Sequence, residues 1–249
     1  CAKARLLAQD QDQEVKECAI SCMGLVLSHL GDACAAEVPA VLPILLERLR
    51  NEITRVTTVK TFQQLATATM DMQLAPVLQP VVAELCSFLR KASRPLRQTS
   101  LGALDTIVLN QAAKLGAADI AAILEELPVL ICDSDLHVAH LALQVCRTVA
   151  QATGASTVPL IKDKIVPKCL HLLQSSLLQG VALRSLLALF AQLVGQNVAG
   201  LDSGALTTQL LALAGGAQMS KHSLSALSQA VAVYCTHAPE PALRDAMVA

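Results

Sequence analysis

The residues whose types are suited to metal binding or catalysis occur in small groups with incomplete spacing. Cys18 and Cys22 are four residues apart, which places both thiols on one face of a helix. A zinc site needs four ligands, and no second pair lies at a suitable spacing. We interpret Cys18 and Cys22 as core thiols, because unpaired cysteine is among the most buried residue types.

A second candidate group joins histidine with acidic side chains. His137 and His140 are three residues apart, and Asp133 and Asp135 lie just before them. Such a set suits a metal ion or a proton-transfer cluster. In the alternative interpretation, which we favour, Asp135 caps a helix and the two histidines are surface or groove residues.

The remaining charged candidates lack the partners that catalysis needs. No other carboxylate lies at a spacing that would place it opposite Glu125 or Glu126 for acid–base catalysis. We therefore interpret both as solvent-exposed helix positions. Three lysines follow no glycine-rich phosphate loop and read as another solvated face: Lys162, Lys164 and Lys168. The sequence also contains no nucleophile elbow, zinc-protease helix or dinucleotide fingerprint. We therefore predict no enzyme, with no catalytic, cofactor-binding or metal-binding residue.

Composition argues against several classes of partner. The net charge is −1, which does not favour a nucleic-acid or membrane surface. Aromatic residues make up 2% of the chain, so few side chains are available to stack on bases. No apolar run reaches the length of a membrane span, and no signal peptide opens the chain. We expect no nucleic-acid, membrane or small-molecule partner.

The cysteines and the first residues indicate the setting of the protein. Nine cysteines are present, and most lie within apolar helical patterns. An odd number of this kind favours reduced, buried thiols in a cytosolic or nuclear protein over a disulfide framework. The chain begins at Cys1 without a methionine and in the middle of a helical pattern, from which we expect a fragment of a longer protein.

The elements that carry these residues are predicted to be paired helices. In Leu45–Leu65 the apolar residues recur every three to four positions on both sides of Asn51, a residue that tolerates the turn conformations that end helices. Neither helix can bury its apolar stripe alone, and the short connection makes the two antiparallel.

This pairing repeats along the chain. Each second helix carries a small residue followed in most cases by an apolar one, and these pairs are separated by 38, 43, 42, 40 and 44 residues. The pairs are Ala19-Ile20, Thr57-Thr58, Ser100-Leu101, Ala142-Leu143, Ala182-Leu183 and Ala226-Leu227. The period brackets the roughly 40–47 residues of HEAT and armadillo repeats. We predict an all-α, HEAT-type helical-repeat solenoid of about six stacked two-helix units, the first one partial.

The predicted units belong to a single array over 1–249, with approximate bounds 1–32, 38–69, 76–116, 119–154, 157–195 and 203–237. Within them we expect helices at Glu14–Leu30, Val38–Leu49, Ile53–Thr67, Pro76–Arg90, Pro95–Leu115, Asp119–Ile131, Asp135–Ala152, Val158–Leu173, Leu178–Val194, Ser203–Ala214 and Lys221–Cys235. Asp12 is expected to cap the first of these helices, and Gly31, Gly154 and Gly195 to end theirs.

Two charged stretches lie at the turns inside units. The first comprises Glu47, Arg48, Arg50, Glu52, Arg55 and Lys60, and the second comprises Arg90, Lys91, Arg94 and Arg97, with no acidic residue between Glu84 and Asp105. Charges collect at turns simply for solvation, which is the simpler interpretation. The alternative is a contact patch whose cationic groups bind a partner's carboxylates. In a regular stack both stretches would fall along the same edge.

The same residues resemble a known family. Leu46–Lys60 (LERLRNEITRVTTVK) is similar to a stretch of the cullin-associated, neddylation-dissociated proteins. Further segments resemble that family in the same order, namely Cys18–Asp32, Ser87–Asp105, Glu125–Val138 and Ser175–Ala182. The resemblance weakens over Asn110–Ala122 and from Gly195 onward.

The resemblance implies a non-enzymatic solenoid that binds a cullin and its RING subunit when the cullin lacks the ubiquitin-like modifier. Such proteins promote exchange of the substrate-receptor modules of ubiquitin ligases in the cytoplasm and nucleus, and this chain would match their C-terminal third. From the matching text together with the local charge, we predict that eight residues contact the partner: Arg48, Arg50, Asn51, Arg55, Arg90, Lys91, Arg94 and Arg97. The alternative is another HEAT scaffold, such as a nuclear-transport receptor or a phosphatase regulatory subunit.

Overall fold

A computed structural model of the chain describes residues 4, 7–68, 74–196, 203–216 and 219–237, and every regular element within these ranges is a helix. The all-α prediction is therefore confirmed for the described residues. The chain divides into two compact units, Cys1–Ile123 and Leu124–Ala249. Each unit is built from helix pairs, whereas the single uninterrupted array over 1–249 stays a prediction.

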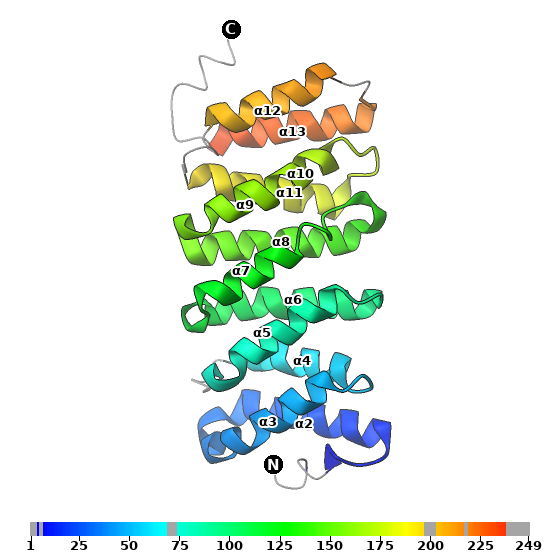
Figure 1. Cartoon of the computed structure of the whole chain (residues 1–249), viewed down its shortest axis with the longest axis vertical. Coiled ribbons are helices and arrows are strands. Elements are labelled where there is room, and N and C mark those ends of the chain that lie inside the picture. The colour runs from blue at the N-terminus through cyan, green and yellow to red at the C-terminus, as the bar shows by residue number, and fades with distance from the viewer. Residues whose placement is uncertain (1–3, 5–6, 69–73, 197–202, 217–218, 238–249) are drawn as a thin grey trace. The chain divides into compact units, whose positions relative to one another are not determined.

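The first unit contains two layers of helices (Figure 1). One layer consists of α2, α4 and α6, which pack side by side in that order, and α3 and α5 pack against it. The elements are α2 (Gln13–Leu30), η1 (Gly31–Glu37), α3 (Val38–Arg50), α4 (Arg55–Ala66), α5 (Ala75–Leu89), α6 (Arg94–Gln111) and η2 (Ala112–Lys114). Helix α7 (Ala117–Glu126) crosses the boundary between the units.

The second unit repeats the scheme. Helix α11 packs between α8 and α13 in one layer, and α9, α10 and α12 form a second layer that packs against the first (Figure 1). The elements are η3 (Asp133–Asp135), α8 (Leu136–Thr153), η4 (Gly154–Ser156), α9 (Val158–Lys164), α10 (Val166–Leu173), α11 (Gly180–Gly195), α12 (Ser203–Gly216) and α13 (Lys221–His237).

Several predicted helix ends are confirmed by their hydrogen bonds. Oδ1 of Asp12 accepts from the backbone N–H of Glu14 at 2.8 Å and of Val15 at 3.1 Å, which satisfies two free donors at the start of α2. Asp135 caps α8 in the same way. Helix α8 ends at Gly154, whose φ of 58° lies in the left-handed region that favours glycine.

The small residues that define the repeat lie in the core. Ala19, Ser100, Ala142, Ala182 and Ala226 are all buried, as is the residue that follows each of them. Their small side chains allow neighbouring helices to approach closely, while leucine, isoleucine and valine fill the remaining space. Thr57, the weakest member of the series, is only partly buried, although Thr58 is fully buried.

Three predicted helices differ from their expected bounds by more than two residues. The helix predicted at Pro95–Leu115 ends at Gln111 and is followed by η2, and the other two are interrupted beside a proline. The stretch Val158–Leu173 forms two helices that meet at Ile165, just before Val166 and Pro167. The predicted helix Asp119–Ile131 ends at Glu126, just before Leu127 and Pro128. Proline lacks a backbone N–H and disfavours helical geometry at the residue before it, and in both places this local effect wins over the apolar pattern.

The interpretation of Cys18 and Cys22 as core thiols is wrong, because both are exposed. Helix α2 buries Ala19, Ile20 and Met23 instead. One residue of offset rotates a helical side chain by about 100°, which is enough to bring the two thiols to the surface. Of the other described cysteines, Cys86, Cys146 and Cys169 are buried, and all eight described cysteines are free thiols.

Side-chain hydrogen bonds link neighbouring helices of the α2–α4–α6 layer, and others link α8 to α11. Oγ1 of Thr57 donates to Glu17 at 3.2 Å, which joins α4 to α2. Nε2 of Gln63 donates to Oγ1 of Thr106 at 3.2 Å, which joins α4 to α6. In the second unit Nε2 of Gln196 donates to the Ala150 carbonyl at 2.7 Å. These bonds define the register of helices that otherwise meet through apolar side chains. None of the described helices is both long and apolar enough to cross a membrane.

Candidate protein-interaction surface

The first predicted charged stretch lies at the turn between α3 and α4, and hydrogen bonds hold the backbone of this turn. The backbone at Asn51 is extended, and its Oδ1 accepts from the Ile53 N–H at 3.0 Å. Thr54 is fully buried, and its hydroxyl donates to the Arg48 carbonyl at 2.8 Å. Asn51 thus shapes the turn, as its position at the end of the predicted helix indicated.

The turn between α5 and α6 fixes the second stretch. Ser93 caps α6 by accepting from the Leu96 N–H at 3.4 Å, and Pro95 occupies the first helical turn, where its missing N–H costs little. Nη1 of Arg97 donates to the Lys91 carbonyl at 2.9 Å. The guanidinium of Arg97 therefore holds the turn together rather than pointing wholly into solvent.

The structure brings the two stretches together within the first unit. Nε of Arg50 donates to Oε1 of Glu84 on α5 at 2.8 Å, although 34 residues separate them. The guanidinium of Arg55 lies over the ring of Phe88, which is buried at the end of α5. We call the resulting surface the basic edge; its predicted members are Arg48, Arg50, Asn51, Arg55, Arg90, Lys91, Arg94 and Arg97.

The members of the basic edge differ in how much they can offer a partner. The Arg48 side chain is 13% exposed and forms an ion pair with Glu47. The Arg50 side chain is 57% exposed even while it binds Glu84. Arg90, Lys91 and Arg94 are exposed as well. The accessible cations therefore lie on α3, α5 and α6 at the turns, where guanidinium groups can bind carboxylates with two parallel hydrogen bonds.

The histidine group is arranged differently from a metal site. Asp135 caps α8, and Asp133 accepts a hydrogen bond from the Ser175 hydroxyl at 2.8 Å. The rings of His137 and His140 are 6.0 Å apart, and Nδ1 of His140 lies 2.6 Å from the Ser185 hydroxyl. In the part of the chain that the structure describes, no three His, Cys, Asp or Glu side chains gather closely enough to hold a metal ion.

Some buried and paired groups have shifted pKa values. Lys164 donates to Glu125 at 2.9 Å, and this hydrogen bond with the attraction of the ammonium lowers the pKa of the carboxyl. Burial raises the pKa of the Cys169 thiol to about 12 and that of Cys146 well above its usual value. Deep apolar surroundings disfavour the thiolate, so these two cysteines are unsuited to nucleophilic chemistry.

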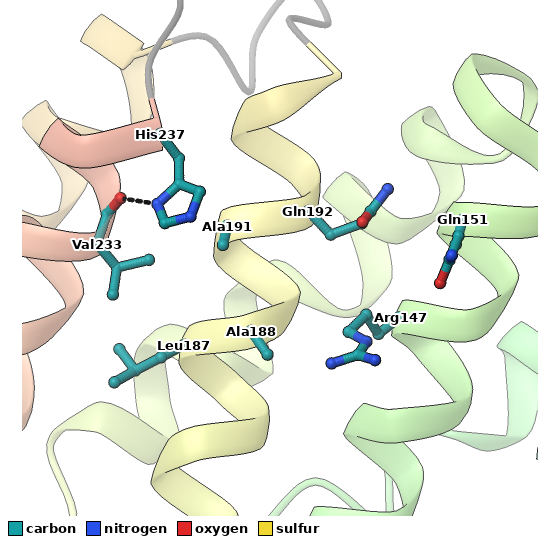
Figure 2. A pocket seen from close by; sticks show the side chains of 8 residues that line it. All are labelled: Arg147, Gln151, Leu187, Ala188, Ala191, Gln192, Val233 and His237. Carbon is teal, nitrogen blue, oxygen red and sulfur yellow. Dashed lines mark hydrogen bonds between the residues drawn. The ribbon is translucent and has the colours of Figure 1, made fainter.

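Sequence reasoning missed a second surface, in the second unit. A groove lies along α8, α11 and α13, and its polar lining includes Arg147, Gln151 and Gln192 (Figure 2). One signal was present in the sequence, since none of these three helices contains an Asp or Glu.

The chain is similar to curated proteins over most of its length. It is 44% identical to cullin-associated NEDD8-dissociated protein 1 of Arabidopsis thaliana, over 93% of this chain and 19% of that protein. It is 40% identical to the Drosophila melanogaster protein of the same name, over 85% of this chain and 17% of that protein. Protein 2 of Rattus norvegicus is 37% identical over 96% and 19%. The chain thus spans about a fifth of the length of these relatives, and the resemblance found in the sequence is confirmed.

Solved structures with low sequence identity show the same fold. A designed armadillo repeat protein matches 93% of this chain with a TM-score of 0.65 at 15% identity, and the match covers 98% of that protein. An engineered protein gives a TM-score of 0.62 at 16% identity, over 93% of this chain and 97% of its own. The helical-repeat fold class is thereby confirmed. No protein-family model matches the chain.

Proposed function

Because the chain is a relative of the cullin-associated NEDD8-dissociated proteins, we propose that it is part of a non-enzymatic scaffold that binds cullin–RING ubiquitin ligase cores. The observation that carries this proposal is the identity of 37–44% over 85–96% of the chain. We assign the chain to the C-terminal third of such a scaffold. Its place of action is then the cytoplasm and the nucleus.

The basic edge is the proposed contact surface for the cullin. Arg50 and Lys91 extend into solvent from neighbouring turns, and Arg90 and Arg94 lie exposed beside them. A helical-repeat protein spreads contacts over several units, so modest individual contributions sum to a specific interface. Arg50 would exchange part of its contact with Glu84 for a carboxylate of the partner.

The proposed outcome of binding is exchange of substrate-receptor modules. Two proteins that bind one cullin and weaken each other's binding are coupled reciprocally, typically by about 1–3 kcal/mol. Such coupling speeds release of a bound receptor module without any bond chemistry. The modifier on the cullin would prevent binding by occupying or reshaping part of the shared surface.

A pull-down with purified components tests the proposal. The chain is immobilised and incubated with a cullin–RING core, either unmodified or carrying the ubiquitin-like modifier. We expect retention of the unmodified core and loss with the double variant Arg50→Glu and Lys91→Glu. The matched control, Lys162→Glu and Lys168→Glu, changes the charge equally on α9 and α10 and should bind like the original chain.

Two outcomes would contradict the proposal. One is equal retention of modified and unmodified cores, and the other is no retention of either by the chain or by a longer protein that contains it. If only the unmodified core binds, and it still binds the Arg50→Glu and Lys91→Glu double variant, the scaffold role stands and the basic edge is the wrong surface. Retention of a small GTPase or a phosphatase subunit instead would favour the alternative HEAT scaffolds.

A further inference from the structure

A continuous groove runs along the seam between α8 and α11 in the second unit. One part is lined by His140, Gln144, Arg147, Arg184 and Ser185, and has a volume of about 360 Å³. The next part has a volume of about 580 Å³ and extends to α13. Both parts share Arg147 and Ala188, so they form one channel. At the helical rise between His140 and Gln151, its length is roughly 16 Å.

Charge along this channel has one sign. Helices α8, α11 and α13 contain no Asp or Glu, and the stretch from Leu136 to His237 contains only Asp163 and Asp202. Asp163 lies on α9, outside the channel lining. A groove whose charged lining residues are all cationic attracts anionic groups, and no Asp or Glu is among the residues that line either part of this channel.

The two arginines of the channel are available to a ligand. Arg147 and Arg184 are both exposed, and neither forms an ion pair with a carboxylate of the described residues. Other cations of the chain behave differently, since Arg50 binds Glu84 and Lys164 binds Glu125. An unpaired guanidinium in a groove is a binding site for a carboxylate, with two parallel hydrogen bonds.

The remaining lining suits a polypeptide. Figure 2 shows Arg147 and Gln151 of α8 facing the same gap as Gln192 of α11, with the small side chain of Ala188 beside it, while Ala191 lies on the side of α11 toward His237. Primary amides can both donate to and accept from the main chain of a bound segment. Alanines leave room for that segment to approach the helix surface closely.

Nucleic acid fits the channel less well. Proteins that hold single strands combine a cationic track with aromatic side chains on which bases stack. Phe190 and Tyr234, which are the phenylalanine and tyrosine of these helices, are fully buried, and the rings in the lining are those of His140 and His237. The channel therefore offers two guanidinium groups for carboxylates but no Phe, Tyr or Trp ring on which bases would stack.

We propose that the α8–α11 channel is a second protein-binding surface that takes an acidic segment of a partner protein, with its carboxylates on Arg147 and Arg184 and its main chain near Gln151 and Gln192. This surface lies on the second unit and does not depend on the basic edge or on the identity of the partner named above. It goes beyond the proposed cullin contact.

Fluorescence anisotropy tests this proposal with a labelled peptide of about five residues, the number that spans the roughly 16 Å of the channel in an extended conformation, with its main chain open to Gln151 and Gln192. The peptide consists of Glu and Ala, and its twin carries Gln in place of every Glu. We expect the acidic peptide to bind and the neutral twin not to bind. Arg147→Gln with Arg184→Gln should weaken binding at least about tenfold, because two charge-assisted contacts are lost.

A matched control separates this site from general attraction. Lys162→Gln with Lys168→Gln removes the same charge from α9 and α10, and should change the affinity less than about twofold. Equal weakening by both double variants, or no binding of the acidic peptide, would overturn the proposal. So would tighter, arginine-dependent binding of a single-stranded DNA of similar length. The four substituted side chains are at least partly exposed, so we expect unchanged circular dichroism and melting temperature.

Discussion

The guanidinium carbon of Arg55 lies 5.3 Å from the centre of the Phe88 ring. This contact joins the first turn of α4 to the last turn of α5, and with the Arg50–Glu84 pair it holds neighbouring turns of the basic edge in one place. Nε of Arg55 is buried and has no hydrogen-bond partner among the described residues, so the ring face is the main compensation for its burial.

A double-mutant cycle measures the Arg55–Phe88 contact. Arg55→Gln removes the cation, Phe88→Leu removes the ring but keeps the site apolar, and the double variant removes both. We expect a coupling of about 0.5–1 kcal/mol in the free energy of unfolding from urea titrations. Strict additivity of the two single effects would show that the ring and the cation do not interact.

The close approach of α2 and α4 makes Gly24 intolerant of a methyl group. A Cβ at Gly24 would lie 2.7 Å from Cγ2 of Thr61, a buried residue whose hydroxyl is held by the Thr57 carbonyl. Gly24→Ala should therefore destabilise the protein by about 1–3 kcal/mol. Gly102→Ala is the control, since its Cβ would meet Gln63 at an ordinary 3.5 Å. Helix propensity should make that change neutral or stabilising, and equal melting temperatures would contradict this account.

The repeat alignment predicts where a large side chain is not tolerated. Ala142 is fully buried on α8, so Ala142→Arg would force a charged side chain between packed helices. We expect several kcal/mol of destabilisation from overpacking and the buried charge. Ala152→Arg, at an exposed position on the same helix, should leave the chemical denaturation midpoint nearly unchanged. A stable Ala142→Arg variant would mean that the repeat phase is wrong.

Thiol reactivity should divide the cysteines into two groups. Cys18 and Cys22 are exposed on α2, whereas Cys146 and Cys169 are fully buried. With a chromogenic disulfide reagent under native conditions at pH 8, Cys18 and Cys22 should react first, and the two buried thiols only after unfolding. Replacing Cys18 and Cys22 by serine should remove the fast phase. Rapid labelling of Cys169 in the folded protein, detected by mass spectrometry, would contradict the structure.

The buried thiols also predict a loss of stability at alkaline pH. The pKa of Cys169 is raised by burial from 9.0 to about 12, so the folded state keeps its proton while the unfolded state loses it. The stabilisation is complete below pH 9 and decreases as the pH rises toward 12, by about 1.4 kcal/mol per pH unit for this thiol. Urea titrations at several pH values should show a shallower decrease for Cys169→Ala. Parallel slopes would show that Cys169 titrates normally.

Much of the fold was predictable because its determinants are local. Asp12, Asp135 and Gly154 end helices through their own side chains or backbone, and the small buried residues recur at the repeat period. Which face of α2 is buried was not predictable, because the exposed residues Cys18 and Leu25 are as apolar in type as the buried ones. The single helix predicted for Val158–Leu173 failed because apolar periodicity outweighed Pro167 in the interpretation.

The candidate surfaces were predictable only in part. The charges at the α3–α4 and α5–α6 turns are visible in the sequence, but the Arg50–Glu84 pair joins residues 34 positions apart. The α8–α11 channel needs Arg147 and Arg184 from two helices, and nothing in either segment alone indicates that they line one groove. Contacts of this kind depend on which helix faces pack together.

The hydrogen bonds that join α4 to α6 and α11 to α8 limit how these helices can move past one another when force is applied. Sliding α4 along α6 by one turn, about 5.4 Å, would separate Gln63 from Thr106 and leave polar groups without partners. Gln196 and Ala150 oppose the same shear between α11 and α8. Elastic strain in each unit should therefore be taken up by small changes in the angle between helices, while their axial alignment is preserved.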